Sequence, residues 1–462
     1  MARRRAGATA IVSFLGDLLL NIADRGRALV GLRRAAALGV ADILRLADAL
    51  MSNRGEASGV ALARDILSGY AALSEADKTA VLIGFAEGFG PPMDRLKAAA
   101  EAFLAEPDPR RAAAVFACAE PRRQELVRRL NLAPGATYAL VLMRADLLER
   151  KAAHPALAAF DEDFVHLFSA WFNRGFLVLR QIQWSSPASI LEKIIRYEAV
   201  HAIAGWDDLR RRLEPQDRRL FAFFHPALAD EPLIFVEVAL TDSVPAAIQP
   251  LLDAPSGQAA TKAPTTAVFY SISNAQKGLA GISFGNFLIK QVVEDLKRET
   301  PGLTTFVTLS PAPGFAAWLA EERAKPASDF ILPEDARALA LLDKPGWAHK
   351  SGAAEAVERA LAPIAAAYFL RARTPSGKPV DPVARFHLGN GARLDRLNPL
   401  GDRSPRGLAQ SHGLMVNYRY ELAEIEQNHE AFAARGEIAA SSAVRKLLRG
   451  KSVASDLLAS LS

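Results

Sequence analysis

Apolar residues recur at every third or fourth position through the first 200 residues or so of the chain. The runs RALVGLRRAAALGVADILRLADAL, SEADKTAVLIGFAEGFG and FDEDFVHLFSAWFNRGFLVL all have this spacing, and they are rich in Ala and Leu with few β-branched residues. This is the period of amphipathic helices. The pattern therefore predicts a bundle of about eight helices in this half of the chain.

After residue 215 the pattern changes to short runs rich in Phe, Val, Ile and Thr. The runs are RLFAFFHP, PLIFVEVALT, TTAVFYSIS, TTFVTLSP and, later, GLMVNYRYEL. Such runs between turn residues indicate strands. Between the third and the fourth run, FGNFLIKQVVEDLKRETPG places its apolar residues on one helix face and stops at Pro301-Gly302. We expect a strand, loop, helix, strand unit within a sheet of about six or seven strands.

Further helices are predicted in the C-terminal half. The runs PGFAAWLAEERA, LPEDARALALL and SGAAEAVERALAPIAAAYFLRA have the helical period. In DPVARFHLGNG, Asp381 precedes Pro382 as an N-cap, and the helix should end between Gly389 and Gly391. The fold class expected is α+β: an N-terminal all-α helical bundle over residues 1–190, followed by a mixed β-sheet domain with flanking helices over residues 191–462.

Composition and charge narrow the class of protein. The chain has 56 basic and 51 acidic residues among 462, and because they are interleaved we expect no nucleic-acid partner. Cys118 is the single cysteine, which excludes an intrachain disulfide and fits a reducing compartment.

Near the basic N-terminus, Asp17 and Asp24 interrupt the apolar run, which predicts an amphipathic helix of a cytoplasmic protein without a membrane span. No H-x-x-x-H or H-E-x-x-H pair occurs, so no metal site is expected.

The glycine-rich stretch KGLAGISFGNFL, residues 277–288, allows three interpretations. Gly281 to Gly285 form a G-x-S-x-G pattern typical of serine hydrolases, for which Asp395 and His412 could supply the acid and the histidine. However, seven residues separate the end of the preceding strand from this pattern, and an elbow serine follows its strand directly. The glycines could also be simple loop residues. In the third interpretation, loop amides and a helix N-terminus face a diphosphate.

The segments VFYSISNAQKGLAGISFGNFLIKQVVEDLKRETPGLTTFVTLSPAPGF, DPVARFHLGNGARL and SHGLMVNYRYEL closely resemble the malonyl-CoA decarboxylase family, over most of residues 190–425. The resemblance implies a catalytic domain of the GNAT acetyltransferase fold, decarboxylation of malonyl-CoA to acetyl-CoA and CO2, and a homo-oligomer of two or four subunits. It implies no cofactor beyond the coenzyme A that the substrate carries. It also implies that a loop after a central strand binds the CoA diphosphate, here Gly278, Leu279, Ala280, Gly281, Ile282, Ser283 and Phe284.

Decarboxylating a malonyl thioester requires hydrogen-bond donors that stabilise an enolate and a group that protonates its carbon. The resemblance implies Thr308, in TTFVTLSP, as the catalytic hydroxyl and His387, in ARFHLGNGA, as the proton donor. Ser310, Tyr418 and His225 are weaker candidates for the acyl pocket. Three alternatives stay open: an acyl-CoA-dependent N-acetyltransferase of the same fold, a serine hydrolase, and a CoA-binding protein without activity.

Overall fold

The computed structural model describes residues 38–52, 55–228, 230–253, 263–282 and 288–449. The chain forms two compact units. The first unit contains the chain as far as Leu177 and two later segments, His225–Ala229 and Gln276–Phe284. The second unit contains Val178–Phe224, Asp230–Ala275 and the chain from Gly285 onward. The amphipathic helix expected at the N-terminus lies outside the described residues.

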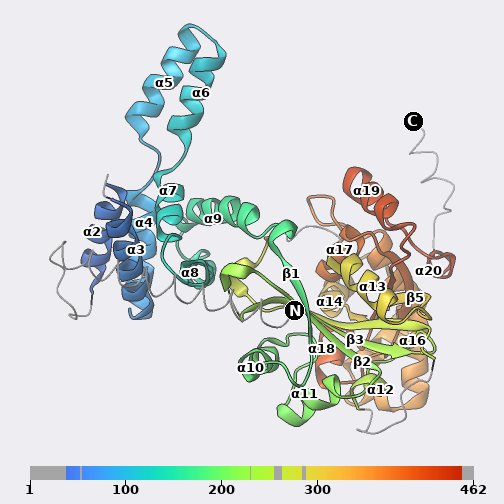
Figure 1. Cartoon of the computed structure of the whole chain (residues 1–462). Coiled ribbons are helices and arrows are strands. Elements are labelled where there is room, and N and C mark those ends of the chain that lie inside the picture. Colours follow the sequence, from blue (N-terminus) through green and yellow to red (C-terminus); the bar gives the residue numbers. More distant parts are fainter. Residues whose placement is uncertain (1–37, 53–54, 229, 254–262, 283–287, 450–462) are drawn as a thin grey trace. The chain divides into compact units, whose positions relative to one another are not determined.

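The first unit is helical, as predicted (Figure 1). Polar caps start several of its helices: Ser74 accepts a hydrogen bond from the Asp77 amide, and Asp108 accepts one from the Arg111 amide just before Pro109. Within the described residues of this unit, eight α-helices lie before Leu177: α2 (Val40–Met51), α3 (Glu56–Ala71), α4 (Glu75–Gly88), α5 (Met93–Ala105), α6 (Pro109–Ala119), α7 (Arg122–Leu130), α8 (Ala136–Arg150) and α9 (Leu157–Trp171).

Two parts of this unit differ in how much they bury. An aromatic ladder, Phe160, Phe164, Phe168 and Phe172, follows one face of α9 with successive ring centroids 4.8 to 5.4 Å apart, and all four rings are buried. In contrast, the α5–α6 hairpin has no buried residue in either helix. The hairpin therefore contributes nothing to the core of its own unit.

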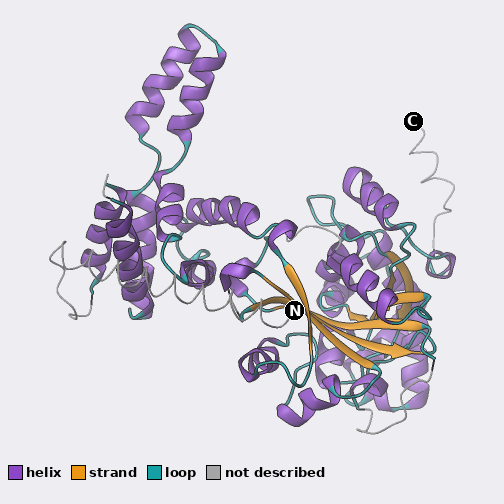
Figure 2. Cartoon of the chain, in the orientation of Figure 1, coloured by secondary structure: helices purple, strands orange, loops and turns teal. Residues whose placement is uncertain are grey.

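The second unit is built on an eight-stranded mixed sheet, drawn in orange in Figure 2. Its order is β1-β2-β3-β4-β5-β8-β6, and β7 pairs with β8. Each of the five predicted strand segments is confirmed, although TTFVTLSP is divided between two strands. The bounds are β1 (Val178–Ile182), β2 (Arg218–Phe224), β3 (Pro232–Thr241), β4 (Thr266–Asn274), β5 (Thr305–Thr308), β6 (Ser310–Pro311), β7 (Arg393–Asn398) and β8 (Met415–Arg419).

Two strands were not predicted, which is why the sheet is larger than the six or seven strands expected. We expected a helix to continue through β1, but β1 is a largely exposed edge strand, so its sequence VLRQI lacks the alternation that marks a half-buried strand. The β7 sequence RLDRLN contains only two apolar residues, Leu394 and Leu397. Strands of this composition carry little periodic signal.

Eleven α-helices accompany the sheet in the described part of the second unit, which confirms the α+β class. The segment LPEDARALALL, expected to be one helix, is a four-residue helix between two 3-10 turns. The helices are α10 (Ala188–Tyr197), α11 (Trp206–Leu213), α12 (Gln249–Leu252), α13 (Leu288–Glu299), α14 (Phe315–Ala324), α15 (Ala336–Leu339), α16 (Ser351–Leu370), α17 (Pro382–Gly389), α18 (Pro405–Ser411), α19 (Ile425–Arg435) and α20 (Ser442–Lys446).

The segment that carries Thr308 and Ser310 loses one of its two neighbouring strands at Thr308. β4 and β5 are parallel neighbours, as the predicted strand, loop, helix, strand unit requires, and this pairing ends at Phe269↔Thr308. On the other side β5 pairs with β8 at Val307↔Arg419, and β6 continues to pair with β8 from Ser310↔Val416. At the change, the Thr308 carbonyl accepts from Asn417 Nδ2 (2.7 Å), and Thr308 Oγ1 accepts from the Tyr418 amide (3.1 Å). Side chains thus satisfy backbone groups where the regular ladder is interrupted.

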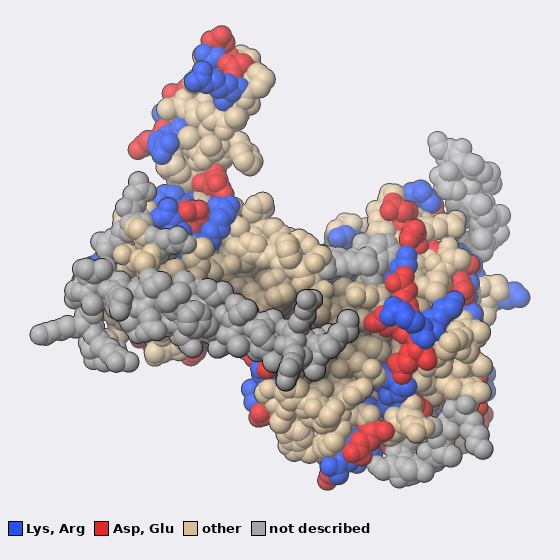
Figure 3. All heavy atoms as spheres, viewed as in Figure 1, with Lys and Arg blue, Asp and Glu red and all other residues tan. Residues whose placement is uncertain are grey.

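Among the described residues, no helix is long and apolar enough to cross a membrane. In the same part of the chain, no group of three or more His, Cys, Asp or Glu side chains is placed to hold a metal ion. On the face of the molecule in Figure 3, basic and acidic side chains are interspersed, as the sequence led us to expect.

Candidate active site

Helix α17 carries His387 in its last turn, and its two ends are fixed by the residues that the sequence pointed to. Asp381 is the N-cap and accepts a hydrogen bond from the Ala384 amide (2.8 Å), with Pro382 as the first helical residue. Beyond the C-terminus, Gly391 has φ +79°, and a Cβ there would lie 2.1 Å from the Ile425 carbonyl oxygen. Only glycine fits this position, so the end of the helix is well determined.

A chain of hydrogen bonds links four side chains of the second unit, on β5, on β6, on α17 and just after β8. Ser310 Oγ donates to Thr308 Oγ1 (2.9 Å) and lies 3.0 Å from His387 Nε2. On the other side of the ring, His387 Nδ1 lies 2.9 Å from the Tyr420 hydroxyl. Each member can both donate and accept. The chain can therefore move a proton toward Ser310 or away from it.

Ser310 and His387 also line a cavity of about 230 Å³. Thr308 is fully buried and is not among the lining residues. A small molecule in this cavity would therefore meet the Ser310 hydroxyl and the His387 imidazole in a mainly apolar setting. The complete lining is Val200, Ile234, Phe269, Tyr270, Ile272, Asn274, Ser310, Pro311, Pro382, Val383, Phe386 and His387.

Tyr418 holds the imidazole from its face rather than by a hydrogen bond. The two rings are stacked, with centroids 4.5 Å apart and planes inclined by 25°. The Tyr418 hydroxyl is buried without a hydrogen-bond partner among the described residues, and burial raises its pKa. Tyr418 is therefore a packing partner of His387 and is not part of the cavity lining.

Burial lowers the pKa of His387 to about 3. The imidazole is surrounded by Ser310, Tyr418 and Tyr420, and none of these carries a charge that would favour the protonated ring. At neutral pH the ring is therefore neutral in the empty site. From sequence alone we expected an imidazole that titrates near neutrality, and the apolar surroundings change this expectation.

The segment predicted to bind diphosphate belongs to the first unit. Within it, the amides of Leu279, Ala280 and Ile282 each donate to the carbonyl oxygen three residues earlier, forming consecutive turns. Gly278 is buried, whereas Ala280 and Gly281 are exposed. Gly281 has φ +76°, a conformation that favours glycine. Ser283, on which the hydrolase interpretation depends, and Phe284 lie outside the described residues.

His225, the remaining candidate, lies in the first unit and is not among the residues that line the cavity. Its Nδ1 accepts from the Ala227 amide (3.1 Å), and its ring packs against Phe172 and Phe176. Burial lowers its pKa. These contacts show that His225 packs within the helical unit.

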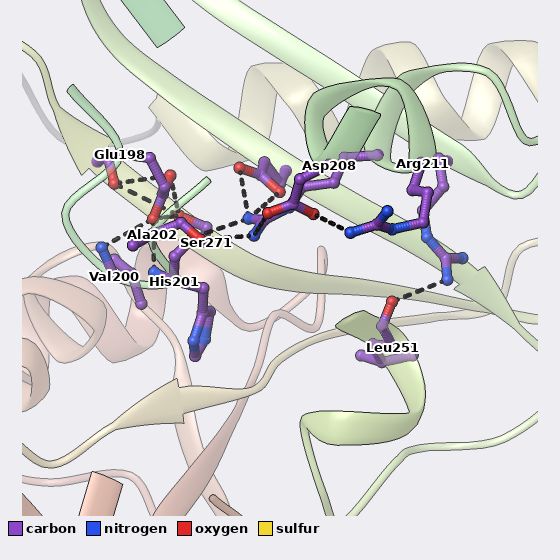
Figure 4. Close-up of polar contacts among 12 residues, drawn as sticks. Glu198, Val200, His201, Ala202, Asp208, Arg211, Leu251 and Ser271 are labelled. Atoms are coloured by element: carbon purple, nitrogen blue, oxygen red, sulfur yellow. Dashed lines mark hydrogen bonds and ion pairs between the residues drawn. The ribbon is translucent and has the colours of Figure 1, made fainter. Parts of the chain in front are cut away.

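A second polar cluster, which the sequence analysis missed, holds one wall of the cavity (Figure 4). The Glu198 carboxylate accepts hydrogen bonds from the Val200 and His201 amides, at 2.7 Å each, and from the hydroxyls of Ser271 and Ser273 on β4. Glu198 therefore ties the loop that contains Val200, a lining residue, to the central strand.

The partner of His387, Tyr420, was also missed, although the sequence contained a signal for it. In NYRYEL, Tyr418 and Tyr420 are two positions apart, and side chains at this spacing point to the same face of an extended segment. Having named Tyr418, the same argument leads to Tyr420. For Glu198 there was no comparable signal, because EAVHAIAG has neither a motif nor a clear period.

Comparison with known proteins agrees with these observations. Family models for the malonyl-CoA decarboxylase N-terminal and C-terminal domains match residues 89–172 and 175–457. A mitochondrial malonyl-CoA decarboxylase of Rattus norvegicus is 34% identical, with 83% of this chain and 84% of that protein covered. The crystal structure of malonyl-CoA decarboxylase from Rhodopseudomonas palustris is 61% identical with a TM-score of 0.86, over 88% of this chain and all of that one. The corresponding structure from Agrobacterium vitis is 58% identical with a TM-score of 0.83, over the same shares of the two chains. The chain belongs to the malonyl-CoA decarboxylase family.

Proposed function

We propose that this protein converts malonyl-CoA to acetyl-CoA and CO2, with Ser310 and His387 as the reacting pair. The observation that carries the proposal is the 3.0 Å contact between Ser310 Oγ and His387 Nε2 on the wall of a cavity, in a chain of this family. A hydroxyl and an imidazole in contact can donate hydrogen bonds and transfer a proton. The malonyl group would occupy the cavity.

The reaction consumes one proton. The bond between the malonyl carboxylate and the α-carbon breaks, CO2 leaves, and the electron pair moves into the thioester carbonyl to give an enolate. The α-carbon then takes a proton and becomes the methyl group of acetyl-CoA. In the empty site the Ser310 hydroxyl donates its single hydrogen to Thr308 Oγ1, so on substrate binding it would turn that hydrogen to the developing enolate oxygen, and the hydrogen-bonded chain through His387 would supply the proton. No metal or redox cofactor is needed, and coenzyme A enters with the substrate.

We assign the reacting hydroxyl to Ser310 rather than to Thr308. Thr308 Oγ1 already accepts from the Tyr418 amide and from Ser310, and it is not in the cavity lining. Its role in this proposal is to orient Ser310. The Tyr418 amide donates to one lone pair of Thr308 Oγ1 and the Ser310 hydroxyl donates to the other, so both acceptor sites of this oxygen are used within the protein.

The substrate would change the protonation of His387. In the empty site burial lowers the His387 pKa to about 3. A malonyl carboxylate close to the ring would favour the imidazolium and raise that pKa. Loss of CO2 then removes the anion, so the acidity of the ring rises at the stage when the enolate needs its proton.

We further propose that the segment Gly278–Ile282 holds the CoA diphosphate. Gly281 is exposed, and its backbone conformation is available to glycine at little cost. A diphosphate accepts hydrogen bonds from backbone amides that point to one place. Lys277, exposed beside this segment, forms a 3.8 Å ion pair with Glu149, so a bound diphosphate would compete with that carboxylate for the lysine.

The test is to incubate purified protein with malonyl-CoA and no acceptor amine, and to measure CO2 and acetyl-CoA. Stoichiometric release of both products is expected. An N-acetyltransferase would release no CO2 and would need an amine, and a thioester hydrolase would instead release free CoA and malonate. Absence of CO2 with intact folding would contradict the proposal.

The protein is also proposed to be a cytoplasmic homo-oligomer that associates through the α5–α6 hairpin. Met93, Leu104 and Phe116 on these helices are 66%, 77% and 80% exposed, and the hairpin buries no residue of its own. Apolar helix surfaces of this kind are usually covered by a partner, and identical subunits are the commonest partner. Cell fractionation tests the location, because the relatives from rat, mouse and goose are named mitochondrial.

A further inference from the structure

One buried arginine of the helical unit is bonded to the proposed diphosphate segment. Arg144 lies in the middle of α8 and is buried. Its Nη1 donates to two carbonyl oxygens of that segment, Gly278 at 2.7 Å and Ala280 at 2.9 Å. Its Nε donates to Asp161 Oδ1 on α9 (2.9 Å), which fixes the guanidinium. All these residues belong to the first unit.

The same face of α8 leaves no room for a side chain at Gly278. Val141 lies three residues before Arg144, and therefore on the same side of the helix. A Cβ on Gly278 would lie 1.8 Å from the Val141 carbonyl oxygen. Only glycine can approach the helix this closely. Backbone contact and arginine together hold the segment against α8.

The hydrogen bond to the Ala280 carbonyl determines where the next amide points. In a trans peptide the N–H and C=O lie in one plane and point in opposite directions. The Ala280 carbonyl faces the buried Arg144, so the amide of Gly281 faces away from the helix. Ala280 and Gly281 are exposed, so this is the solvent side. Arg144 thus sets the direction of one amide of the proposed diphosphate segment.

The charges behind the segment also favour an anion. Asp161 accepts from Arg144 through Oδ1 and from Lys151 Nζ through Oδ2 (2.7 Å). Two cations therefore share one carboxylate, which leaves an excess of one positive charge. Partly buried charges are weakly screened, so their effect extends to the exposed side of a thin segment.

We propose that Arg144 is a positioning residue for coenzyme A: it orients the Ala280–Gly281 peptide so that the Gly281 amide can bind the diphosphate. The inference rests on the proposed function of this segment. It gives the helical unit a direct part in substrate binding besides the association role suggested above.

The test compares Arg144→Lys with a matched control, Arg123→Lys. Arg123 is also buried, and it donates to Asp163 on α9 (2.6 Å) and to the Ala86 carbonyl oxygen (2.8 Å); among the described residues it forms no hydrogen bond to the diphosphate segment. Lysine keeps the charge but lacks the planar, multiple donors of arginine. We expect Arg144→Lys to raise the Kd for CoA and the KM for malonyl-CoA about tenfold, with kcat changed less than about twofold. Arg123→Lys should lower the Tm and leave both constants unchanged.

Calorimetry with CoA separates this inference from the proposed reaction. Wild-type protein that binds CoA but releases no CO2 would contradict the reaction, while the comparison of CoA affinities would still decide the role of Arg144. Equal CoA affinity in wild type and Arg144→Lys would overturn the inference, as would an equal loss in the two variants. If Arg144→Lys does not fold, Gly278→Ala is the second variant: it displaces the segment while Arg144 is intact, and CoA affinity should fall in the same way.

Discussion

Ser310 and His387 are 77 positions apart in the sequence, yet Ser310 Oγ lies 3.0 Å from His387 Nε2. Two local features bring them together. The pairing with β4 ends at Thr308 while the pairing with β8 continues through Ser310 in β6, and the Asp381 cap and Gly391 fix the two ends of the helix that carries His387. The pair therefore depends on backbone structure that is well determined on both sides.

The first prediction separates Ser310 from Thr308. Ser310→Ala removes the only hydroxyl of the two that lines the cavity, so kcat for CO2 release should fall about 10²-fold or more. Thr308→Ser keeps the hydroxyl that accepts from the Tyr418 amide and should lower kcat only a few-fold. The reverse order, with Ser310→Ala active and Thr308→Ser inactive, would return the catalytic role to Thr308.

The sequence predicted structure correctly where a residue type serves one local structural purpose, such as starting or ending a helix. Asp381 before Pro382 predicts a helix start, and the glycines after Leu388 predict its end, so His387 was placed correctly on its helix. The choice between Thr308 and Ser310 was different, because both lie in one short strand-like run. Which of them faces the cavity depends on where the pairing with β4 ends, and that is a property of the whole sheet.

Long-range polar contacts could not be predicted for a similar reason. Arg144 lies within a regular helical pattern, and its bonds to Gly278 and Ala280 join positions 134 and 136 residues apart. The low pKa of His387 also depends on residues brought together by folding, since burial is its cause. A sequence motif identifies the histidine but says nothing about its solvation.

The second prediction concerns Tyr420, whose hydroxyl lies 2.9 Å from His387 Nδ1. Tyr420→Phe leaves a buried ring nitrogen without this partner, which costs about 1–3 kcal/mol of stability. Because the hydroxyl also fixes the ring, kcat should fall about tenfold or more while KM changes little. Tyr418→Phe is the control: its hydroxyl has no hydrogen-bond partner among the described residues, so both kcat and stability should be nearly unchanged.

The third prediction concerns pH. Burial lowers the pKa of His387 to about 3, so the ring of the free enzyme is already neutral above about pH 5. Because kcat/KM reports groups of the free enzyme and the proposed proton donor is the protonated ring, kcat/KM should fall about tenfold for each pH unit throughout the range from about pH 5 to pH 8. A plateau below about pH 6.5, followed by a fall above it, would show that this histidine titrates normally.

The lowered pKa of His387 also makes the free energy of unfolding depend on pH. Between a pKa of about 3 in the folded protein and the ordinary value near 6.5, the unfolded chain binds a proton at His387 that the folded chain does not. The contribution of the neutral His387 to the free energy of unfolding is therefore fully present above about pH 6.5 and is lost as the pH falls below it. His387→Gln should lose less unfolding free energy than wild type between about pH 7 and pH 5, measured by urea unfolding.

The fourth prediction tests the hairpin. Phe116 is 80% exposed in the subunit, so Phe116→Glu should leave the folded monomer stable. If a second copy covers this face, a buried glutamate would cost several kcal/mol and the protein should become smaller in sedimentation equilibrium. Leu132→Glu, also at an exposed apolar position but on a different segment, is the matched control and should keep the wild-type mass. An unchanged mass for Phe116→Glu would exclude the hairpin as the interface.

The fifth prediction concerns Glu198, which holds the loop containing Val200 against β4. Its carboxylate accepts from two amides and two hydroxyls, and all four of these groups are donors. Glu198→Gln removes the negative charge, and its NH2 group would require the Ser271 and Ser273 hydroxyls to turn and accept, so the charge-assisted hydrogen bonds weaken and the loop loosens at a cost of about 1–3 kcal/mol. Because Val200 lines the cavity, KM for malonyl-CoA should rise several-fold, with a smaller effect on kcat.

The control for Glu198 is Glu192→Gln, on the helix that ends just before Glu198. Glu192 is exposed and, among the described residues, pairs only with Arg196 at 3.2 Å, one turn away, an interaction worth little at the surface. It should leave both the Tm and KM unchanged. If Glu198→Gln lowered the Tm without moving KM, the Val200 loop would be a structural element alone. A rise in KM measured at a temperature where Glu198→Gln is fully folded would instead show that this cluster shapes the cavity. It would do so indirectly, by holding the backbone of the Val200 loop in place.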